Sequence, residues 1–111
     1  MPLRIATLVK QIPAFEAFRL DADGHLDRTG AALEMNAYCR RAVAQAVALA
    51  QESGAGDDQG VFVTLGPPPA DDVLREALAW AIERGVDARG LHVSDPAFAG
   101  SDTLATARAL A

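Results

Sequence analysis

The stretch Val61-Phe-Val-Thr-Leu-Gly-Pro-Pro-Pro-Ala-Asp-Asp-Val-Leu-Arg-Glu-Ala-Leu-Ala-Trp-Ala-Ile-Glu-Arg-Gly85 contains a strand pattern, a proline turn and a helix pattern in succession. Residues 61–65 form a short apolar run, which is typical of a strand buried in a parallel sheet. Residues 70–84 then predict a helix that has two aspartates in its first turn and ends at Gly85. The apolar stripe predicted for this helix contains Val73, Leu74, Ala77, Leu78, Ala81 and Ile82.

Similar patterns flank this unit. Residues 3–9 and 91–93 are further apolar runs that predict buried strands. Asn36 is a favourable N-cap for a helix that runs to about Ser53, and Gly54 is a favourable stop. Residues 18–20 and 25–27 flank Asp23-Gly24, which predicts a small β-hairpin.

The order strand, hairpin, helix, strand, helix, strand, helix predicts an α/β fold. We expect a Rossmann-like, three-layer αβα domain with a parallel sheet, about half of a doubly wound domain, with the hairpin as an excursion. We expect residues 1–111 to belong to one α/β domain of the kind that binds nucleotides.

Composition excludes several classes of protein. The formal net charge of −5 argues against a nucleic-acid partner, because no basic stripe is present. The single cysteine excludes an internal disulfide and a cysteine-cluster metal site. No apolar run is long enough for a membrane span and no signal peptide is visible, which favours a cytoplasmic location. No Ser-His-Asp or Cys-His arrangement supports hydrolytic catalysis.

The final segment, 95–111, predicts a strand end, a small-residue loop and a helix that begins at Ser101. A turn of this kind presents free backbone N–H groups and the positive end of a helix dipole to anions. The helical spacing continues to the last residue without a capping signal, so we expect that the chain is cut within a longer protein.

Ligands of such sheets bind beyond the carboxyl ends of the strands, here residues 8–15, 65–68 and 94–103. All three segments contain Pro, Gly or small residues. None contains a dinucleotide or P-loop fingerprint. Architecture alone therefore predicts only a general nucleotide site.

Five segments make the interpretation more specific. They are Leu8-Val-Lys-Gln-Ile-Pro13, Met35-Asn-Ala-Tyr38, Thr64-Leu-Gly-Pro67, Asp72-Val-Leu-Arg-Glu-Ala-Leu78 and Ser94-Asp-Pro-Ala-Phe-Ala-Gly-Ser-Asp-Thr103. In this order they resemble the N-terminal part of an electron transfer flavoprotein beta subunit, in the form found in the bifurcating and related bacterial branch. Members of that family are about twice this length or more.

The resemblance implies an electron-carrier subunit, not an enzyme, that pairs with an alpha subunit as a heterodimer. It implies AMP, or a second FAD in its place, on the beta subunit. The redox FAD is shared with the alpha subunit, and electrons pass from flavin dehydrogenases to downstream acceptors. The resemblance places the cofactor contacts at Leu8, Phe15, Asn36, Ala37, Tyr38, Cys39, Leu65, Gly66, Ser101, Asp102, Thr103 and Thr106.

Three departures from the family pattern concern the nucleotide site. Ala37 stands where the family usually has proline, and Arg40 stands where a glutamate is usual. The link 80–89 is longer than the usual Gly-Ala-Asp-Arg link. These departures leave the choice between AMP and FAD open.

An ordinary structural role is an alternative interpretation for several of these residues. On the residues alone, a helix cap is the favoured interpretation of Asn36, and an N-cap cluster is favoured for residues 101–103. Cys39 suits a small residue on a helix face, and Phe15 suits loop packing equally well. Trp80 suits a packing or interface anchor.

Two other functions remain open, namely a non-redox adenine-nucleotide-binding module and a structural fragment without a ligand. Without the later strands of the family, the first strand would lie at a sheet edge, where it invites pairing with another chain. We therefore expect the isolated chain to bind nucleotide weakly or not at all, and to associate with itself or with a partner.

Overall fold

The computed structural model describes residues 2–13, 22, 24, 33–100 and 102–111. None of the helices within these ranges combines the length and the apolar character that crossing a bilayer requires. In chain order the elements are β1 (Ile5–Leu8), β2 (Gln11–Pro13), β3 (Leu33–Met35), α1 (Ala37–Glu52), β4 (Gly60–Leu65), η2 (Pro68–Ala70), α2 (Asp71–Glu83), β5 (Ala88–Val93), η3 (Pro96–Phe98) and α3 (Thr103–Leu110).

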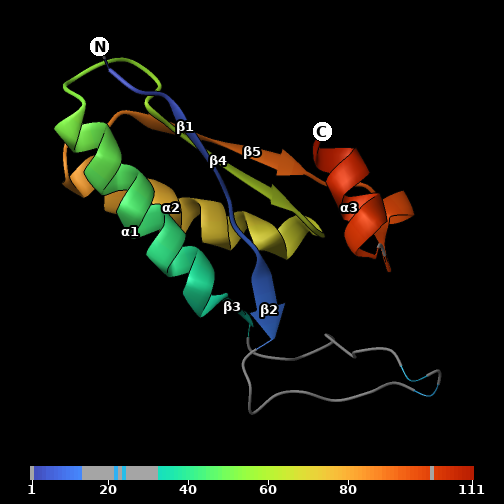
Figure 1. Ribbon diagram of the computed structural model, residues 1–111. Coiled ribbons are helices and arrows are strands. Elements are labelled where there is room, and N and C mark those ends of the chain that lie inside the picture. The colour runs from blue at the N-terminus through green and yellow to red at the C-terminus, as the bar shows by residue number, and fades with distance from the viewer. Residues whose placement is uncertain (1, 14–21, 23, 25–32, 101) are drawn as a thin grey trace.

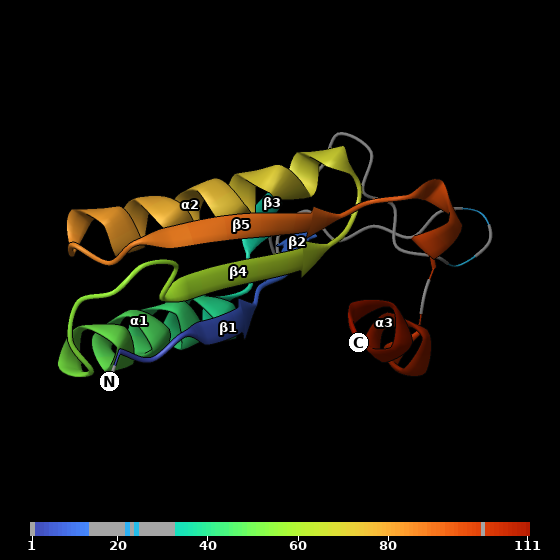
Figure 2. The ribbon, with the colours of Figure 1, turned by 90° about the horizontal axis from the view of Figure 1, so that it is seen from above.

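The main sheet is parallel and has the order β1-β4-β5. Thr7 lies opposite Phe62, and Phe62 lies opposite Gly90. Helices α1 and α2 both pack on one face of this sheet (Figure 1), and α3 lies beyond the carboxyl ends of the strands in both views (Figure 2). These features confirm the predicted α/β fold with a parallel sheet.

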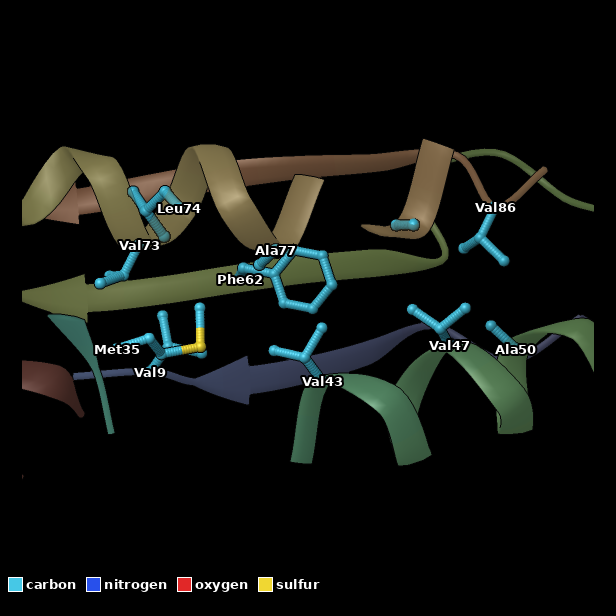
Figure 3. Close-up of a cluster of buried hydrophobic side chains, with 11 residues drawn as sticks. Val9, Met35, Val43, Val47, Ala50, Phe62, Val73, Leu74, Ala77 and Val86 are labelled. Carbon is cyan, nitrogen blue, oxygen red and sulfur yellow. The ribbon is translucent and has the colours of Figure 1, made fainter. Parts of the chain in front are cut away.

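The core lies between β4 and the two helices. Phe62 has no exposed surface, and its ring lies between Val43 of α1 and Ala77 of α2 (Figure 3). Small side chains on the two helices let them approach the sheet closely around this ring. The buried hydrophobic cluster consists of Val9, Met35, Val43, Val47, Ala50, Phe62, Val73, Leu74, Ala77, Ala81 and Val86.

The ends of the two long helices are confirmed. The Asn36 side chain accepts a hydrogen bond from the Tyr38 N–H at 2.8 Å, as an N-cap does. Gly54 (φ 99°) and Gly85 (φ 73°) follow α1 and α2 in the left-handed conformation that glycine adopts without steric cost.

Two strand boundaries differ from the prediction. β1 covers only residues 5–8, whereas β5 begins at Ala88 instead of Leu91. The extension includes Gly90, where an added Cβ would lie 3.3 Å from the Leu74 Cδ1 atom of α2. Close packing of the helix on the strand thus explains a glycine that weakened the strand pattern.

The prediction for α2 was wrong at one residue of its stripe. Val73, Leu74, Ala77 and Ala81 are buried and Leu78 packs partly against them. Ile82 is 66% exposed, because one step of a helix beyond Ala81 turns it toward the outer surface.

The start of α3 and the second sheet also differ. α3 begins at Thr103, and the Asp102 side chain caps it by accepting the Ala105 N–H at 2.8 Å, whereas the prediction began the helix at Ser101. The predicted hairpin strands 18–20 and 25–27 lie outside the described residues. An antiparallel pair that sequence reasoning missed, β2 with β3, brackets that segment.

The second face of the main sheet is mainly apolar, and α1 and α2 do not cover it. Side chains alternate between the two faces of a strand, so the side chains of β4 that do not enter the core lie on this second face. The register places their partners on β1 and β5 beside them. Leu8 is 56% exposed and Leu91 46% exposed. We call this surface the open face; it consists of Ala6, Leu8, Val61, Val63, Leu65, Arg89, Leu91 and Val93.

The open face predicts that the purified chain self-associates, because contiguous exposed apolar surface favours burial against another molecule. Leu91→Lys should shift the chain toward the mass of a single protomer in size-exclusion chromatography with light scattering. The control Ile82→Lys adds the same charge at an exposed apolar residue of α2 and should leave the distribution unchanged. A monodisperse wild-type monomer would contradict this prediction.

Candidate functional site

Backbone hydrogen bonds gather several predicted site segments at the carboxyl edge of the sheet. The Asn36 N–H donates to the Lys10 carbonyl at 2.9 Å, which places the start of α1 beside the end of β1. The Val9 N–H donates to the Val63 carbonyl at 2.9 Å, and the Gly66 N–H donates to the Val93 carbonyl at 3.1 Å. The ends of β1, β4 and β5 and the N-terminus of α1 therefore form one connected edge.

The N-terminus of α1 presents its first turn to solvent. Ala37 and Tyr38 are exposed, Tyr38 by 78%, and Asn36 is half-buried while its side chain caps the helix. Cys39 is half-buried and packs against the core, as expected for a residue on the inner helix face. Structure thus supports the capping role of Asn36 and leaves the surface of the first turn accessible to a ligand.

The helix N-termini at this edge differ in their suitability for an anion. The first turn of α1 contains no acidic residue. Asp71 and Asp72 occupy the first turn of α2, and prolines precede them. The carboxylate of Asp102 already occupies the N-terminus of α3. Because acidic groups repel phosphate and prolines lack N–H donors, α1 is the most suitable of the three helices.

Leu8 and Leu65 belong to the open face at this edge. Leu8 lies opposite Val63 in the register. Leu65 is the next residue of β4 whose side chain lies on the same face of the sheet. Leu8 is exposed and Leu65 half-buried. Together they offer apolar surface next to Gly66, where the chain leaves the sheet.

The other predicted site residues belong to the α3 segment or lie outside the described residues. Asp102 caps α3 and Thr106 lies within it, and this helix lies beyond the strand ends (Figure 2). Thr103 is the first residue of α3. Phe15 and Ser101 lie outside the described residues.

Arg40, one of the departures noted in the sequence, forms an ion pair between α1 and α2. Its Nε and Nη2 atoms donate to the two carboxylate oxygens of Glu76 at 3.0 and 3.2 Å. The hydrogen bond with Glu76, and then its charge, raise the pKa of Arg40 above the ordinary value. The pair joins α1 to α2, so this departure has a local structural explanation.

A cavity of about 310 Å³ lies between α1 and α2, and Met35 of β3 also lines it. The Arg40–Glu76 pair and Trp80 contribute to its wall, and the Arg84 guanidinium lies 3.4 Å from the centroid of the Trp80 ring. Among the described residues, none of the predicted cofactor contacts lines this cavity; the lining residues are Met35, Arg40, Val43, Glu76, Ala77 and Trp80.

Sequence reasoning missed three polar side chains that hold loops of this domain. Gln59 is 3% exposed, and its Nε2 atom contacts oxygen atoms at the C-terminus of α1. Gln11 donates to the Pro69 carbonyl at 2.9 Å, and His92 contacts the Gly66 carbonyl at 3.0 Å. The partners of Gln11 and His92 are backbone carbonyls distant in sequence, so no local pattern indicated these two contacts. Within the described ranges no group of three or more His, Cys, Asp or Glu side chains converges on a metal site.

Comparison with known proteins agrees with the resemblance in the sequence. The model of the electron transfer flavoprotein domain matches residues 23–111. The electron transfer subunit gamma of acryloyl-CoA reductase from Anaerotignum propionicum is 36% identical over 96% of this chain and 37% of its own length. Protein FixA from Azorhizobium caulinodans is 36% identical over 98% of this chain and 36% of its own length. The electron transfer flavoprotein subunit beta of Clostridium acetobutylicum is 33% identical over 98% of this chain and 39% of its own length. The chain thus spans less than two-fifths of each of these relatives.

Proposed function

Because the chain belongs to the electron transfer flavoprotein family, we propose that it acts as a beta-type subunit of such a protein and contributes an adenine-nucleotide site at the carboxyl edge of its sheet. Residues 1–111 form the N-terminal portion of the nucleotide-binding domain in this proposal. The protein is an electron-carrier subunit of the cytoplasm and performs no bond chemistry itself.

The observation that carries this proposal is the connected edge formed by the end of β1, the first turn of α1 and the end of β4. The acid-free N-terminus of α1 supplies N–H groups and a positive dipole end for a phosphate. Leu8 and Leu65 supply the apolar surface that an adenine ring requires.

The cofactors in this proposal are AMP, or a second FAD in its position, and a redox FAD shared with an alpha subunit. A subunit of this kind acts by binding, orienting and electrostatically tuning the flavin. Alpha subunit and beta subunit form a heterodimer that accepts electrons from flavin dehydrogenases. Such a partner also gives the open face an apolar surface to contact.

The test is co-expression with an electron transfer flavoprotein alpha subunit, followed by absorption spectroscopy and chromatography of the released nucleotides. We expect a flavin band and an adenine nucleotide with the wild-type chain. Asn36→Asp should keep the helix cap but weaken AMP binding about tenfold, because it places a carboxylate beside the phosphate. Asn36→Ser is the matched control, since it caps the helix without a charge.

Several outcomes would contradict the proposal. A complex that carries no flavin and no adenine nucleotide would refute it, and equal AMP affinity of the Asp and Ser variants would refute the phosphate position at α1. Tight ATP binding by the isolated monomeric chain would instead support the non-redox nucleotide-binding module.

A further inference from the structure

The turn between β4 and α2, residues 66–69, has an unusual supply of hydrogen-bonding groups. Three of its four residues are prolines, which have no N–H to donate. We call these residues the proline turn. At its first residue an added Cβ would lie 3.0 Å from the Ala70 Cβ atom, so the turn folds tightly back on the start of α2.

Strand β5 holds both backbone polar groups of Gly66. The Gly66 N–H donates to the Val93 carbonyl at 3.1 Å, and the Gly66 carbonyl lies 3.0 Å from His92 Nε2. Since a carbonyl can only accept, His92 Nε2 carries the proton of this hydrogen bond. Hydrogen bonds of both its N–H and its carbonyl group therefore fix the position of Gly66 relative to β5.

A second side chain holds the other end of the proline turn. Gln11 of β2 is buried, and its Nε2 atom donates to the Pro69 carbonyl at 2.9 Å. β2 follows β1 directly in sequence, whereas β5 lies at the opposite edge of the described sheet. Two elements that are distant in the chain thus fix the two ends of one four-residue turn.

The surroundings of these donors are polar, in contrast to the apolar core beneath the rest of α2. Thr64 lies opposite His92 in the register of β4 and β5. Its hydroxyl is buried and has no hydrogen-bond partner within the described part of the chain. Burying polar groups in a protein core costs free energy. The concentration of polar groups beside the proline turn therefore indicates that the conformation of this turn is important for function.

We propose that His92 and Gln11 are positioning residues for the nucleotide site: they hold the proline turn so that Leu65 and Gly66 keep the backbone shape that receives the adenine nucleotide. This inference rests on the proposed function, because it assigns a role at the same carboxyl edge. Neither residue contacts the ligand in this proposal, and both act through Gly66 and Pro69.

The first arm of the test measures amide hydrogen exchange of Gly66 by NMR in the isolated chain. His92→Leu removes the donor at similar size and should accelerate exchange of this amide about tenfold, as expected for the loss of about 1.4 kcal/mol of local stability. His92→Gln keeps a donor at the Nε2 position and should retain wild-type exchange. Equal exchange in all three proteins would overturn the proposal.

The second arm measures AMP affinity of the complex with the alpha subunit. His92→Leu should weaken AMP binding about tenfold, and His92→Gln should restore it to within a factor of about three. The control Gln51→Leu removes another bond from a side chain to a backbone carbonyl, that of Arg84, at the far end of α2. It should leave AMP affinity unchanged.

The two arms separate the failure of this inference from failure of the proposed function. If the wild-type complex binds neither AMP nor FAD, the proposed function is wrong. If the wild-type complex binds AMP, and His92→Leu loses stability without losing affinity, His92 has only a structural role and the inference is wrong.

Discussion

Phe62→Ala should lower the free energy of unfolding by about 3–5 kcal/mol, a large part of the stability of a domain of this size. The ring has no exposed surface and fills the space between Val43 of α1 and Ala77 of α2. Its neighbours on both helices are small, so they cannot expand to fill the cavity that alanine would leave. The measurement is equilibrium unfolding in urea followed by circular dichroism.

The matched control is Ile82→Ala. Ile82 belongs to α2 but is 66% exposed, so its truncation should change the unfolding free energy by less than about 0.5 kcal/mol. Similar losses in the two variants would show that the core does not centre on Phe62. Phe62→Leu should give an intermediate loss, because leucine retains most of the apolar volume.

Gln59→Met should lower the free energy of unfolding by about 1–3 kcal/mol, although it preserves the length and flexibility of the side chain. Gln59 Nε2 lies 2.7 Å from the Gly54 carbonyl, 3.2 Å from the Ala50 carbonyl and 3.3 Å from Ser53 Oγ. It therefore satisfies carbonyl groups that the end of α1 leaves without helical partners. Methionine removes these hydrogen bonds from a buried position and provides no replacement.

Urea unfolding of Gln51→Met provides the comparison for Gln59. Gln51 donates to a single carbonyl, that of Arg84, from an exposed position where water can replace it. Its replacement should cost well under 1 kcal/mol. If the two variants were equally stable, the buried position of Gln59 would not be the source of its effect.

These two residues show where sequence reasoning succeeded and where it did not. Phe62 lies in an apolar run whose pattern alone predicted a buried strand, and its burial followed from that prediction. Gln59 lies in the polar segment between α1 and β4, where the sequence offers no sign that a glutamine is buried. Its burial depends on the return of the chain past the end of α1, which no local pattern encodes.

The candidate site divides in the same way. Asn36 was identified as a helix cap from local chemistry, and its assignment to the cofactor site came only from the resemblance. Its place at the sheet edge was seen only in the structure, where its N–H donates to the Lys10 carbonyl. The role of Arg40 needed its partner Glu76, 36 residues away. The contacts of His92 and Gln11 with the proline turn likewise span 26 and 58 residues.

The sequence by itself determined the order of the main strands and helices, the N-cap of α1, the glycines that end α1 and α2, and the family, because apolar periodicity, caps and motifs act over a few neighbouring residues. Only the tertiary structure decided the pairing of β2 with β3, the exposure of Ile82 and the open face. It also decided which polar side chains hold the proline turn. These features depend on contacts between residues distant in the chain, and their energies are set by geometry that folding creates.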